Sequence, residues 1–375
     1  MSGVRPEEYD LVVVGGGPAG LATAICSAQA GLDAVVIEGR RPPVDRACGE
    51  GIMPDGVAAL SEMGIEIGAS SSSVFVGIRY FDGPVRAEAR FPQGGGLGVR
   101  RVVLHDALRT RAEELGVRLL WGEKVTGLHP DGVQIDGGAM LGRWVVGADG
   151  RTSPLRRMAG LEGRAPRGSR LGVRRHYRIA PWSDLVEVHW ADGCELYVTP
   201  VASDLVGVAA LTHHGGGRFD EVLAAFPAVE SRLQGAPVAS RDRGAGPFGQ
   251  RCRQPIEGRV VLVGDAGDSL DPITGEGLSV AFHQARELVA CIAEGRVDEY
   301  PTIHRRLLRV PKTLTGLLTF AAGHPPVRRR VIKALASSPS LFERCLAISS
   351  RSADVGLTGR HGILTLAWDL ALHGI

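Results

Sequence analysis

The clearest hydrophobic pattern lies near the start of the chain. Two uninterrupted apolar runs, residues 11–14 and 34–37, flank a glycine-rich turn and a segment with helical packing residues that ends at Gly31. Short uninterrupted runs of this kind indicate strands that are buried on both faces, as in parallel sheets. The pattern therefore predicts a strand–helix–strand unit over residues 9–38.

Two later apolar runs, residues 144–148 and 260–263, predict further buried strands, and residues 117–120 are expected to form another strand of the same sheet. From about residue 168 to 212 apolar and polar positions alternate, which is typical of an antiparallel sheet, and we assign this stretch to a separate lobe. The apolar run at 260–263 then returns to the first domain. The expected fold class is α/β: a Rossmann-like domain interrupted by an antiparallel-sheet lobe of α+β type, with C-terminal helices.

The same pattern predicts helices and domain boundaries. Helices are expected over residues 54–63, from Arg101 to near Gly116, over 219–233 and over 278–292, and the last 75 or so residues are expected to form short helices broken by Pro311, Pro325, Pro326 and Pro339. The predicted domains are residues 1–65, 97–165 and 255–298 for the Rossmann-like domain, 66–96 and 166–254 for the second lobe, and 299–375 for a C-terminal helical region.

Composition narrows the class of protein. The 375 residues are 44% hydrophobic and 22% charged with a net charge of +2, as in an ordinary globular protein without the charge of a nucleic-acid binder. The six cysteines are scattered and contain no C-x-x-C pair, which argues against a zinc site or a disulfide framework and for a reducing compartment. We expect no metal, no signal peptide and no membrane-spanning segment, and a cytoplasmic location.

The turn between the first two strands carries the first chemical signal. Gly15, Gly17 and Gly20 form a G-x-G-x-x-G motif, and Glu38 ends the second strand. In such a unit the glycines permit a tight turn, a close backbone approach to a pyrophosphate and close helix packing. The helix N-terminus attracts the phosphates, and Glu38 can accept hydrogen bonds from ribose hydroxyls. This stretch therefore predicts a dinucleotide site.

Two further motifs follow in a set order. One is Gly147-Ala148-Asp149-Gly150, and the other is Gly264-Asp265-Ala266 followed by Pro272 and Gly275-Glu276-Gly277. With the first motif, they make residues 8–295 resemble the FAD-dependent oxidoreductases of the para-hydroxybenzoate hydroxylase fold. That family includes group A flavin monooxygenases and geranylgeranyl reductases. The resemblance implies FAD as cofactor and NAD(P)H as its probable reductant.

The resemblance also implies roles for individual residues. Asp265 would accept hydrogen bonds from the ribitol, the backbone after Pro272 would approach the flavin ring, and the helix beginning near Leu278 would stabilise negative charge on the reduced flavin. Arg101 would approach FAD from a helix start. The implied FAD-binding residues are Gly15, Gly17, Pro18, Ala19, Gly20, Glu38, Gly39, Arg40, Arg46, Cys48, Gly49, Arg101, Val125, Asp149, Gly150, Asp265, Pro272, Gly275, Glu276, Gly277 and Leu278.

The reaction type stays open between two branches of the family. The stretches Cys48-Gly49-Glu50-Gly51 and 271–277 resemble geranylgeranyl reductases, but the strand 195–200 keeps only the Tyr and Pro of the reductase motif and lacks its Trp. The halogenase W-x-W-x-I-P motif is absent, and no Lys precedes Glu123. We expect an NAD(P)H- and O2-dependent monooxygenase of a small organic or specialised metabolite. The alternatives are a reductase of isoprenoid double bonds and a flavoprotein that modifies or partners another protein.

Catalytic candidates come from the expected contact between the second lobe and the flavin. Cys48, Tyr197 and Glu195 are expected to line the substrate pocket there. Tyr197 is equally consistent with a core aromatic, and Cys48 with a small packing residue. The pair His213-His214 is interpreted as part of a loop, because adjacent strand residues point to opposite faces and Gly215–Gly217 follow.

The C-terminal region is rich in basic residues beside apolar ones. They are Arg305, Arg306, Arg309, Lys312, Arg328, Arg329, Arg330 and Lys333. A basic amphipathic helix can lie on a membrane surface, which would suit a hydrophobic substrate. We favour the alternative that these residues form the solvated face of helices covering the second lobe. As partners of the protein as a whole, we expect a small-molecule substrate and no nucleic acid, since the net charge is only +2.

Overall fold

In the computed structural model, residues 8–164, 170–213 and 217–350 are described. The first half of the fold is a mainly parallel sheet with strand order β17-β18-β11-β1-β2-β8. Its strands are β1 (Glu8–Val14), β2 (Ala34–Glu38), β8 (Arg118–Trp121), β11 (Gly138–Gly147), β17 (Ile256–Glu257) and β18 (Val260–Leu262). In addition, β10 (Gly132–Ile135) pairs with β11, and β9 (Val125–His129) pairs with β10. This parallel sheet confirms the Rossmann-like prediction.

The parallel sheet is apolar throughout its interior. Helices α1 (Pro18–Gln29), α3 (Arg101–Glu114) and α7 (Gly277–Ala293) pack on one face, and leucine, valine and isoleucine side chains fill the interface. After the second lobe, the chain returns to the parallel sheet, where β18 pairs with β11. Val145, Val146 and Gly147 lie opposite Val260, Val261 and Leu262. The interrupted topology is therefore held by an apolar strand pair distant in sequence.

The second sheet has seven strands in the order β16-β12-β15-β14-β13-β5-β6. Its strands are β5 (Gly77–Asp82), β6 (Val85–Arg90), β12 (Leu171–Arg178), β13 (Val186–Ala191), β14 (Cys194–Ala202), β15 (Leu205–Thr212) and β16 (Arg243–Ala245). The pair β13–β5 is parallel and the other pairs are antiparallel. The strand pairs within residues 171–212 are antiparallel as predicted, and β5, from an earlier part of the chain, adds one parallel pair beside β13, which makes this a mixed sheet.

The pleat of the mixed sheet separates apolar and polar side chains. Leu196 and Val198 face α5 (Phe219–Leu223) and α6 (Pro227–Leu233), whereas Glu195, Tyr197 and Thr199 point to the opposite face. The prediction of one helix over 219–233 is wrong, because α5 ends at Leu223 and a separate helix, α6, begins at Pro227, whose missing N–H is tolerated at a first helical position. The polar face is the one turned away from these two helices.

A small sheet links the two larger ones. It joins β3 (Gly51–Ile52), β7 (Gly96–Val99) and β4 (Ser72–Phe75), and helices α2 (Pro54–Glu62) and α4 (Pro154–Met158) lie in the same half as the parallel sheet. A Cβ atom on Gly98 would stand 1.7 Å from the Pro200 carbonyl oxygen. The absence of a side chain at Gly98 therefore lets the small sheet pack directly on the backbone of β14.

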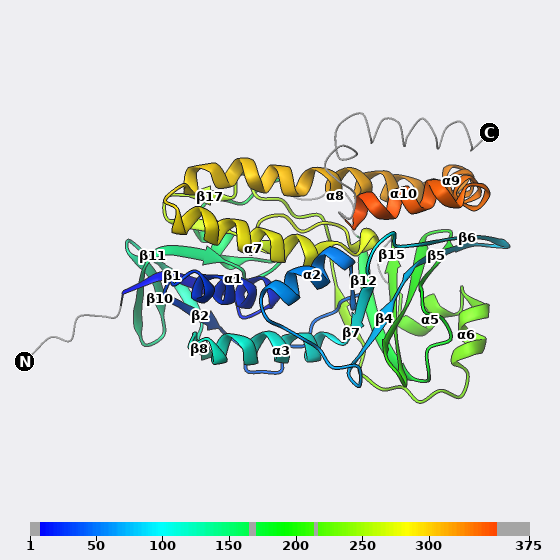
Figure 1. The fold of residues 1–375 in the computed structure, drawn as a ribbon, viewed down its shortest axis with the longest axis horizontal. Coiled ribbons are helices and arrows are strands. Elements are labelled where there is room, and N and C mark those ends of the chain that lie inside the picture. The colour runs from blue at the N-terminus through cyan, green and yellow to red at the C-terminus, as the bar shows by residue number, and fades with distance from the viewer. Residues whose placement is uncertain (1–7, 165–169, 214–216, 351–375) are drawn as a thin grey trace, which may run out of the picture.

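Three helices form the C-terminal layer along one edge of the molecule (Figure 1). They are α8 (Tyr300–Gly323), α9 (Pro325–Ser337) and α10 (Pro339–Ser349). Pro325 and Pro339 lie at helix starts, as expected from the predicted helix breaks. The prediction that Pro311 interrupts a helix is wrong, since α8 continues through it. Pro311 is buried against the rest of the protein, and this packing offsets its missing hydrogen bond. Among the described helices, none combines the length and apolarity needed to cross a bilayer.

Candidate functional site

The glycine-rich turn after β1 is built by close backbone contacts. Gly15 has a φ of +112°, and a Cβ there would stand 2.4 Å from the Ala148 carbonyl oxygen; a Cβ on Gly20 would stand 1.9 Å from the Gly15 carbonyl oxygen. By contrast, nothing lies within 4 Å of a Cβ placed on Gly17. Two glycines of the motif therefore let elements pack, and the third leaves space in front of the N-terminus of α1, which begins at Pro18 and Ala19.

Glu38 lies at the end of β2 beside this turn. Its carboxylate accepts hydrogen bonds from the backbone N–H groups of Gly16 and Arg40, each at 3.0 Å. The turn is also held by His105, a residue that sequence reasoning missed, whose Nε2 lies 2.9 Å from the Gly16 carbonyl oxygen. Burial lowers the pKa of His105, so the neutral ring can donate to that carbonyl.

Three charged residues, each from a different element, lie in surroundings that are largely enclosed by protein but that a ligand can reach. Asp265 follows β18 and Asp149 follows β11, and burial raises the pKa of both carboxyls. The Asp265 side chain is nevertheless exposed, so protein surrounds a carboxyl that a ligand can reach. Arg101 begins α3, and its buried Nε has no hydrogen-bond partner among the described residues. Such orphaned donors are ones that a bound ligand satisfies.

The other predicted cofactor residues are spread over neighbouring elements. Gly275 ends the 3₁₀ turn Pro272–Thr274 with a φ of +71°, and buried Glu276 precedes α7, whose first residues are Gly277 and Leu278. Gly49, Gly150 and Gly277 also have open space where a Cβ would stand. Val125 begins β9, and Gly39 approaches the Lys124 side chain instead of open space. Burial lowers the pKa of Arg46.

Glu50 connects the Cys48 loop to both halves of the protein. It is 2% exposed and is the positive-φ non-glycine residue among the described residues, with a φ of +60°. Its Oε1 accepts the Arg101 backbone N–H at 2.8 Å, and its Oε2 is hydrogen-bonded to His176 Nε2. His176 in turn lies 2.7 Å from Ser240 Oγ through Nδ1. A buried carboxylate thus fixes the loop against β12 and the start of α3.

Arg174 supports the same loop from β12. It is 2% exposed and donates to Asp45 Oδ1 at 2.7 Å and to the Arg46 carbonyl oxygen at 3.2 Å. Cys48 is half-buried, its Sγ accepts the Glu50 N–H at 3.3 Å, and burial raises the pKa of its thiol. The Cys48 side chain is therefore a protonated thiol held at a fixed position and not a thiolate nucleophile.

A second buried cluster faces loop 271–277 from the mixed sheet. Glu195 is 1% exposed; its carboxylate pairs with Arg170, and its Oε1 lies 2.9 Å from His213 Nε2. Arg170 Nε lies 3.4 Å from Asp271 Oδ2, and burial raises the pKa of Asp271. His213 follows β15 outside a regular element, in agreement with a loop, and His214 lies outside the described residues. Sequence spacing gave no signal of the His213–Glu195 contact.

Tyr197 joins the same loop two residues along β14. Its hydroxyl donates to the Ile273 carbonyl oxygen at 3.3 Å, and burial raises its pKa far above the ordinary value. Ile273 belongs to an apolar cluster that contains Tyr80, Trp190 and Phe342. The structure thus brings Tyr197 and Glu195 to one loop, whereas Cys48 lies on a different loop held by Glu50.

A third polar cluster follows Asp265 but has an internal cation. Ligand atoms of Cys252, Asp268 and His304 lie within 4.8 Å of one another. Asp268 already accepts from Lys312 Nζ at 3.1 Å and lies 2.9 Å from His304 Nε2. Because the ammonium group supplies the counter-charge, we interpret this cluster as a tie between α8 and the residues after β18.

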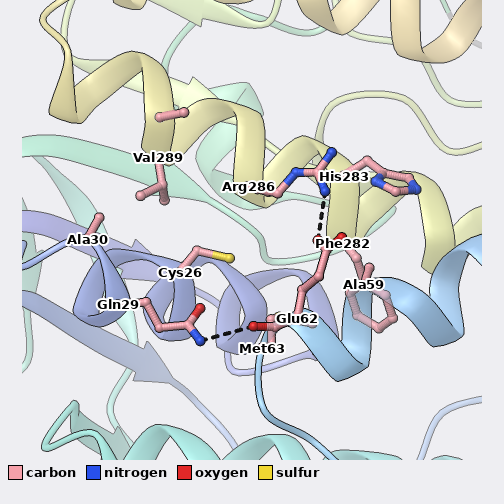
Figure 2. Close-up of a pocket in the computed structure, with 11 residues that line it drawn as sticks. Cys26, Gln29, Ala30, Ala59, Glu62, Met63, Phe282, His283, Arg286 and Val289 are labelled. Atoms are coloured by element: carbon pink, nitrogen blue, oxygen red, sulfur yellow. Dashed lines mark hydrogen bonds and ion pairs between the residues drawn. The ribbon is translucent and has the colours of Figure 1, made fainter.

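One surface pocket of about 300 Å³ lies between α1, α2 and α7 (Figure 2). Its wall is mainly apolar, with an ion pair between Arg286 and Glu62 at 2.7 Å on one side. Burial raises the pKa of Cys26, which lines it, to about 11, so the thiol stays protonated. The pocket contains none of the site residues predicted from the sequence, and neither Glu50 nor Glu195 lines it.

Comparison with known proteins places this geometry in a family. Residues 8–200 match the family described as FAD binding domain. The chain is 30% identical over 352 residues to a menaquinone reductase of Mycobacterium tuberculosis, covering 84% of this chain and 85% of that protein. It is 29% identical over 367 residues to a para-nitrophenol 4-monooxygenase of a Pseudomonas strain, covering 85% and 89%.

The fold is also found among solved structures. A flavoprotein/dehydrogenase from Cytophaga hutchinsonii superposes with a TM-score of 0.81 at 18% identity, covering 97% of this chain and 96% of that chain. The family match extends over more than half of the chain, and the reductase relative is similar over most of both sequences. The chain therefore belongs to the FAD binding domain family and is an FAD-dependent oxidoreductase.

Proposed function

We propose that the protein is an NAD(P)H- and O2-dependent monooxygenase that hydroxylates a small organic substrate with an apolar body and an ionisable hydroxyl group. The observation that carries this proposal is the buried Glu195–His213–Arg170 cluster against Asp271. A carboxylate–imidazole pair beside the reacting position is suited to accept a hydroxyl proton. The nearby Tyr80, Trp190 and Phe342 provide an apolar surrounding.

The residues of this chain fit FAD. The open space at Gly17 and the start of α1 suit a pyrophosphate, Glu38 suits the ribose hydroxyls, and the reachable carboxyl of Asp265 suits ribitol hydroxyls. Arg101 has an unsatisfied Nε to offer, and the turn at Gly275 with the N-terminus of α7 suits the flavin ring. We propose that these residues, with their predicted neighbours, hold the cofactor.

The proposed reaction balances as NAD(P)H, a proton, O2 and the substrate C–H giving NAD(P)⁺, water and the substrate C–OH. Bound FAD would supply the hydride acceptor and the oxygen activation. Glu195 and His213 would accept and return the proton of the substrate hydroxyl, and Arg170 would keep Glu195 oriented. Tyr197 would hold the loop by its hydrogen bond to Ile273.

A second candidate is reduction of a carbon–carbon double bond. The stretches 48–51 and 271–277, which resemble those of geranylgeranyl reductases, favour it, and Cys48, whose Sγ accepts the Glu50 N–H at 3.3 Å, would be the candidate proton donor. A relative that is 30% identical is a menaquinone reductase. In this reaction NAD(P)H and a proton would saturate the substrate, and no oxygen would be consumed.

The first experiment is an anaerobic titration of the FAD-loaded protein with NADPH or NADH, followed by visible absorbance. Bleaching of the flavin supports direct reduction by the nicotinamide. Adding ¹⁸O2 with a set of phenolic substrates, and in parallel with isoprenoid substrates that contain carbon–carbon double bonds, then separates the two candidates. One ¹⁸O atom in the product supports the monooxygenase. A product that gains two hydrogens without ¹⁸O contradicts it and supports the reductase. A protein that cannot be loaded with FAD would contradict both.

A further inference from the structure

We propose that one face of α8 and α9 docks on the surface of an anionic lipid bilayer. The residues that we assign to this face, here called the basic face, are all exposed: Arg309, Leu317 and Phe320 on α8, and Arg329, Arg330 and Lys333 on α9. The proposal concerns where the enzyme works and does not depend on whether it is a monooxygenase or a reductase. Four features of the C-terminal layer support it.

The first feature is charge. Residues 300–337, which form α8 and α9, contain eight Lys and Arg residues and no Asp or Glu. Because the whole chain has a net charge of +2, the remainder of the chain has a net charge of −6. The positive charge is therefore concentrated on two adjacent helices, and the surface that it complements is a negative one.

The second feature is that only some of the basic residues make contacts within the protein, while others are exposed to solvent. Lys312 binds Asp268 at 3.1 Å, and Arg328 is 2% exposed and binds Asp82, the Ala191 carbonyl and Asp192. These two residues are tertiary contacts, as expected for helices that cover the mixed sheet. Arg309, Arg329, Arg330 and Lys333 are exposed. Arg329 approaches Asp192 only at 3.9 Å, while Arg328 lies 2.8 Å from the same carboxylate.

The third feature is an exposed apolar pair within the positive region. Leu317 is 47% exposed and Phe320 is 55% exposed, three residues apart on α8. At 100° per residue, Arg309, Leu317 and Phe320 share one side of the helix, and His304, Leu308 and Thr315 are buried on the other. An apolar pair among cations is the arrangement by which interfacial helices insert side chains below anionic headgroups.

The fourth feature is the position of the face relative to the site. Thr315, on the buried side of α8, lies 3.4 Å from Thr274 through their hydroxyl oxygens. Loop 271–277 therefore contacts the inner side of the same helix whose outer side carries Leu317 and Phe320. A bilayer held against the basic face would lie about one helix diameter, ~10 Å, from this loop. An apolar substrate dissolved in the bilayer would thus be close to the site.

Vesicle flotation of the full-length, FAD-loaded protein tests the proposal. The probe is vesicles of phosphatidylglycerol and phosphatidylcholine in equal parts, compared with pure phosphatidylcholine, at low and high salt. We expect binding to the anionic vesicles that salt weakens. The variant Arg329→Gln/Arg330→Gln/Lys333→Gln should lower the partition coefficient by roughly a hundredfold. The variant Leu317→Ser/Phe320→Ser should lower it by about tenfold or more.

The control removes the same charge from other faces. Arg178, Arg253 and Arg259 are exposed residues outside the C-terminal layer, and the variant Arg178→Gln/Arg253→Gln/Arg259→Gln should keep at least a third of the wild-type partition coefficient. FAD content and the thermal unfolding midpoint show that each variant is folded. All six positions of the basic face are at the surface or partly exposed, so substitution leaves the core intact.

Three results would overturn the proposal. The wild type could fail to float with anionic vesicles at low salt. The control variant could lose as much binding as the Arg329→Gln/Arg330→Gln/Lys333→Gln variant, which would mean that net charge alone decides. Finally, the wild type could be an oligomer that Leu317→Ser/Phe320→Ser dissociates, which would assign the face to a second copy of the chain.

Discussion

The parallel sheet and the mixed sheet contribute different kinds of groups to the candidate site. In β1, β2, β11 and β18 the buried side chains are apolar, and the candidate site lies beyond the strand ends, at close-packed glycines and at Glu38 and Asp265. In β12 and β14 of the mixed sheet, charged side chains are themselves buried: Arg174 and Glu195 are 2% and 1% exposed. The first half of the site therefore depends on close backbone approach beyond apolar strands, and the second depends on charged side chains paired inside the sheet.

This difference has a physical consequence for how each half fails. A backbone-built site depends on close approach, so a single added methyl group disturbs it. A site built from buried charges depends on partners, so removing one partner leaves the other uncompensated in a low-dielectric interior. The four predictions below test the comparison, beginning with the largest effect.

Substitution Gly20→Ala should disturb the parallel half most. The new Cβ would stand 1.9 Å from the Gly15 carbonyl oxygen, so the backbone must shift. We expect a loss of about 3 kcal/mol or more in unfolding free energy and little retained FAD. Gly17→Ala is the matched control, because nothing lies within 4 Å of its Cβ. It should fold like the wild type in urea denaturation yet bind FAD at least tenfold more weakly; equal stability of the two variants would contradict the packing argument.

Substitution Glu50→Ala should destabilise the protein by a similar amount. It leaves His176 and Arg174 buried without their shared carboxylate and releases the Arg101 N–H. We expect a loss of about 3–5 kcal/mol in urea denaturation. The exposed ion pair between Arg178 and Asp204 is the control, and Asp204→Ala should cost under about 1 kcal/mol. A Glu50→Ala variant as stable as Asp204→Ala would show that the half of the site beside the mixed sheet does not depend on its buried charges.

Substitution Glu195→Gln tests the proposed chemistry. It keeps the shape but removes the charge beside His213, and turnover should fall by about a hundredfold with unchanged FAD content. Glu187→Gln is the control, because Glu187 is also buried in the mixed sheet but bonds to Arg79, Trp182 and His189, outside loop 271–277. Stability should fall in both variants. Turnover that falls equally in both would assign Glu195 a structural role only.

Substitution Asp268→Asn should give the smallest effect, and one that depends on pH. Burial alone would raise the pKa of Asp268, but the hydrogen bond from His304 and the charge of Lys312 hold it below its ordinary value of 3.8. A lowered carboxyl pKa adds stability above the unfolded-state value and loses it as pH falls through the folded-state value. We therefore expect wild type to exceed Asp268→Asn by about 1–3 kcal/mol near pH 7, with the difference shrinking below about pH 4. A difference that is constant with pH would contradict the ionised pair.

The sequence predicted the parallel half well because its signals are local. The apolar runs of β1, β2 and β18, the glycines of the turn and the start of α7 follow from neighbouring residues. Predictions were wrong where packing overrides local preference. Pro311 stays inside α8, and the predicted helix over 219–233 is divided into α5 and α6.

What the sequence determined by itself is therefore the half with the parallel sheet: its apolar strands, the glycines that permit close approach and the positions of the acidic residues Glu38 and Asp265 at or just after strand ends. Only the tertiary structure decided the other half. Glu50 meets His176 across 126 positions, and Glu195 meets His213 across 18. A buried charge is tolerated only beside its partner, and partners so far apart in the chain leave no periodic trace in the sequence.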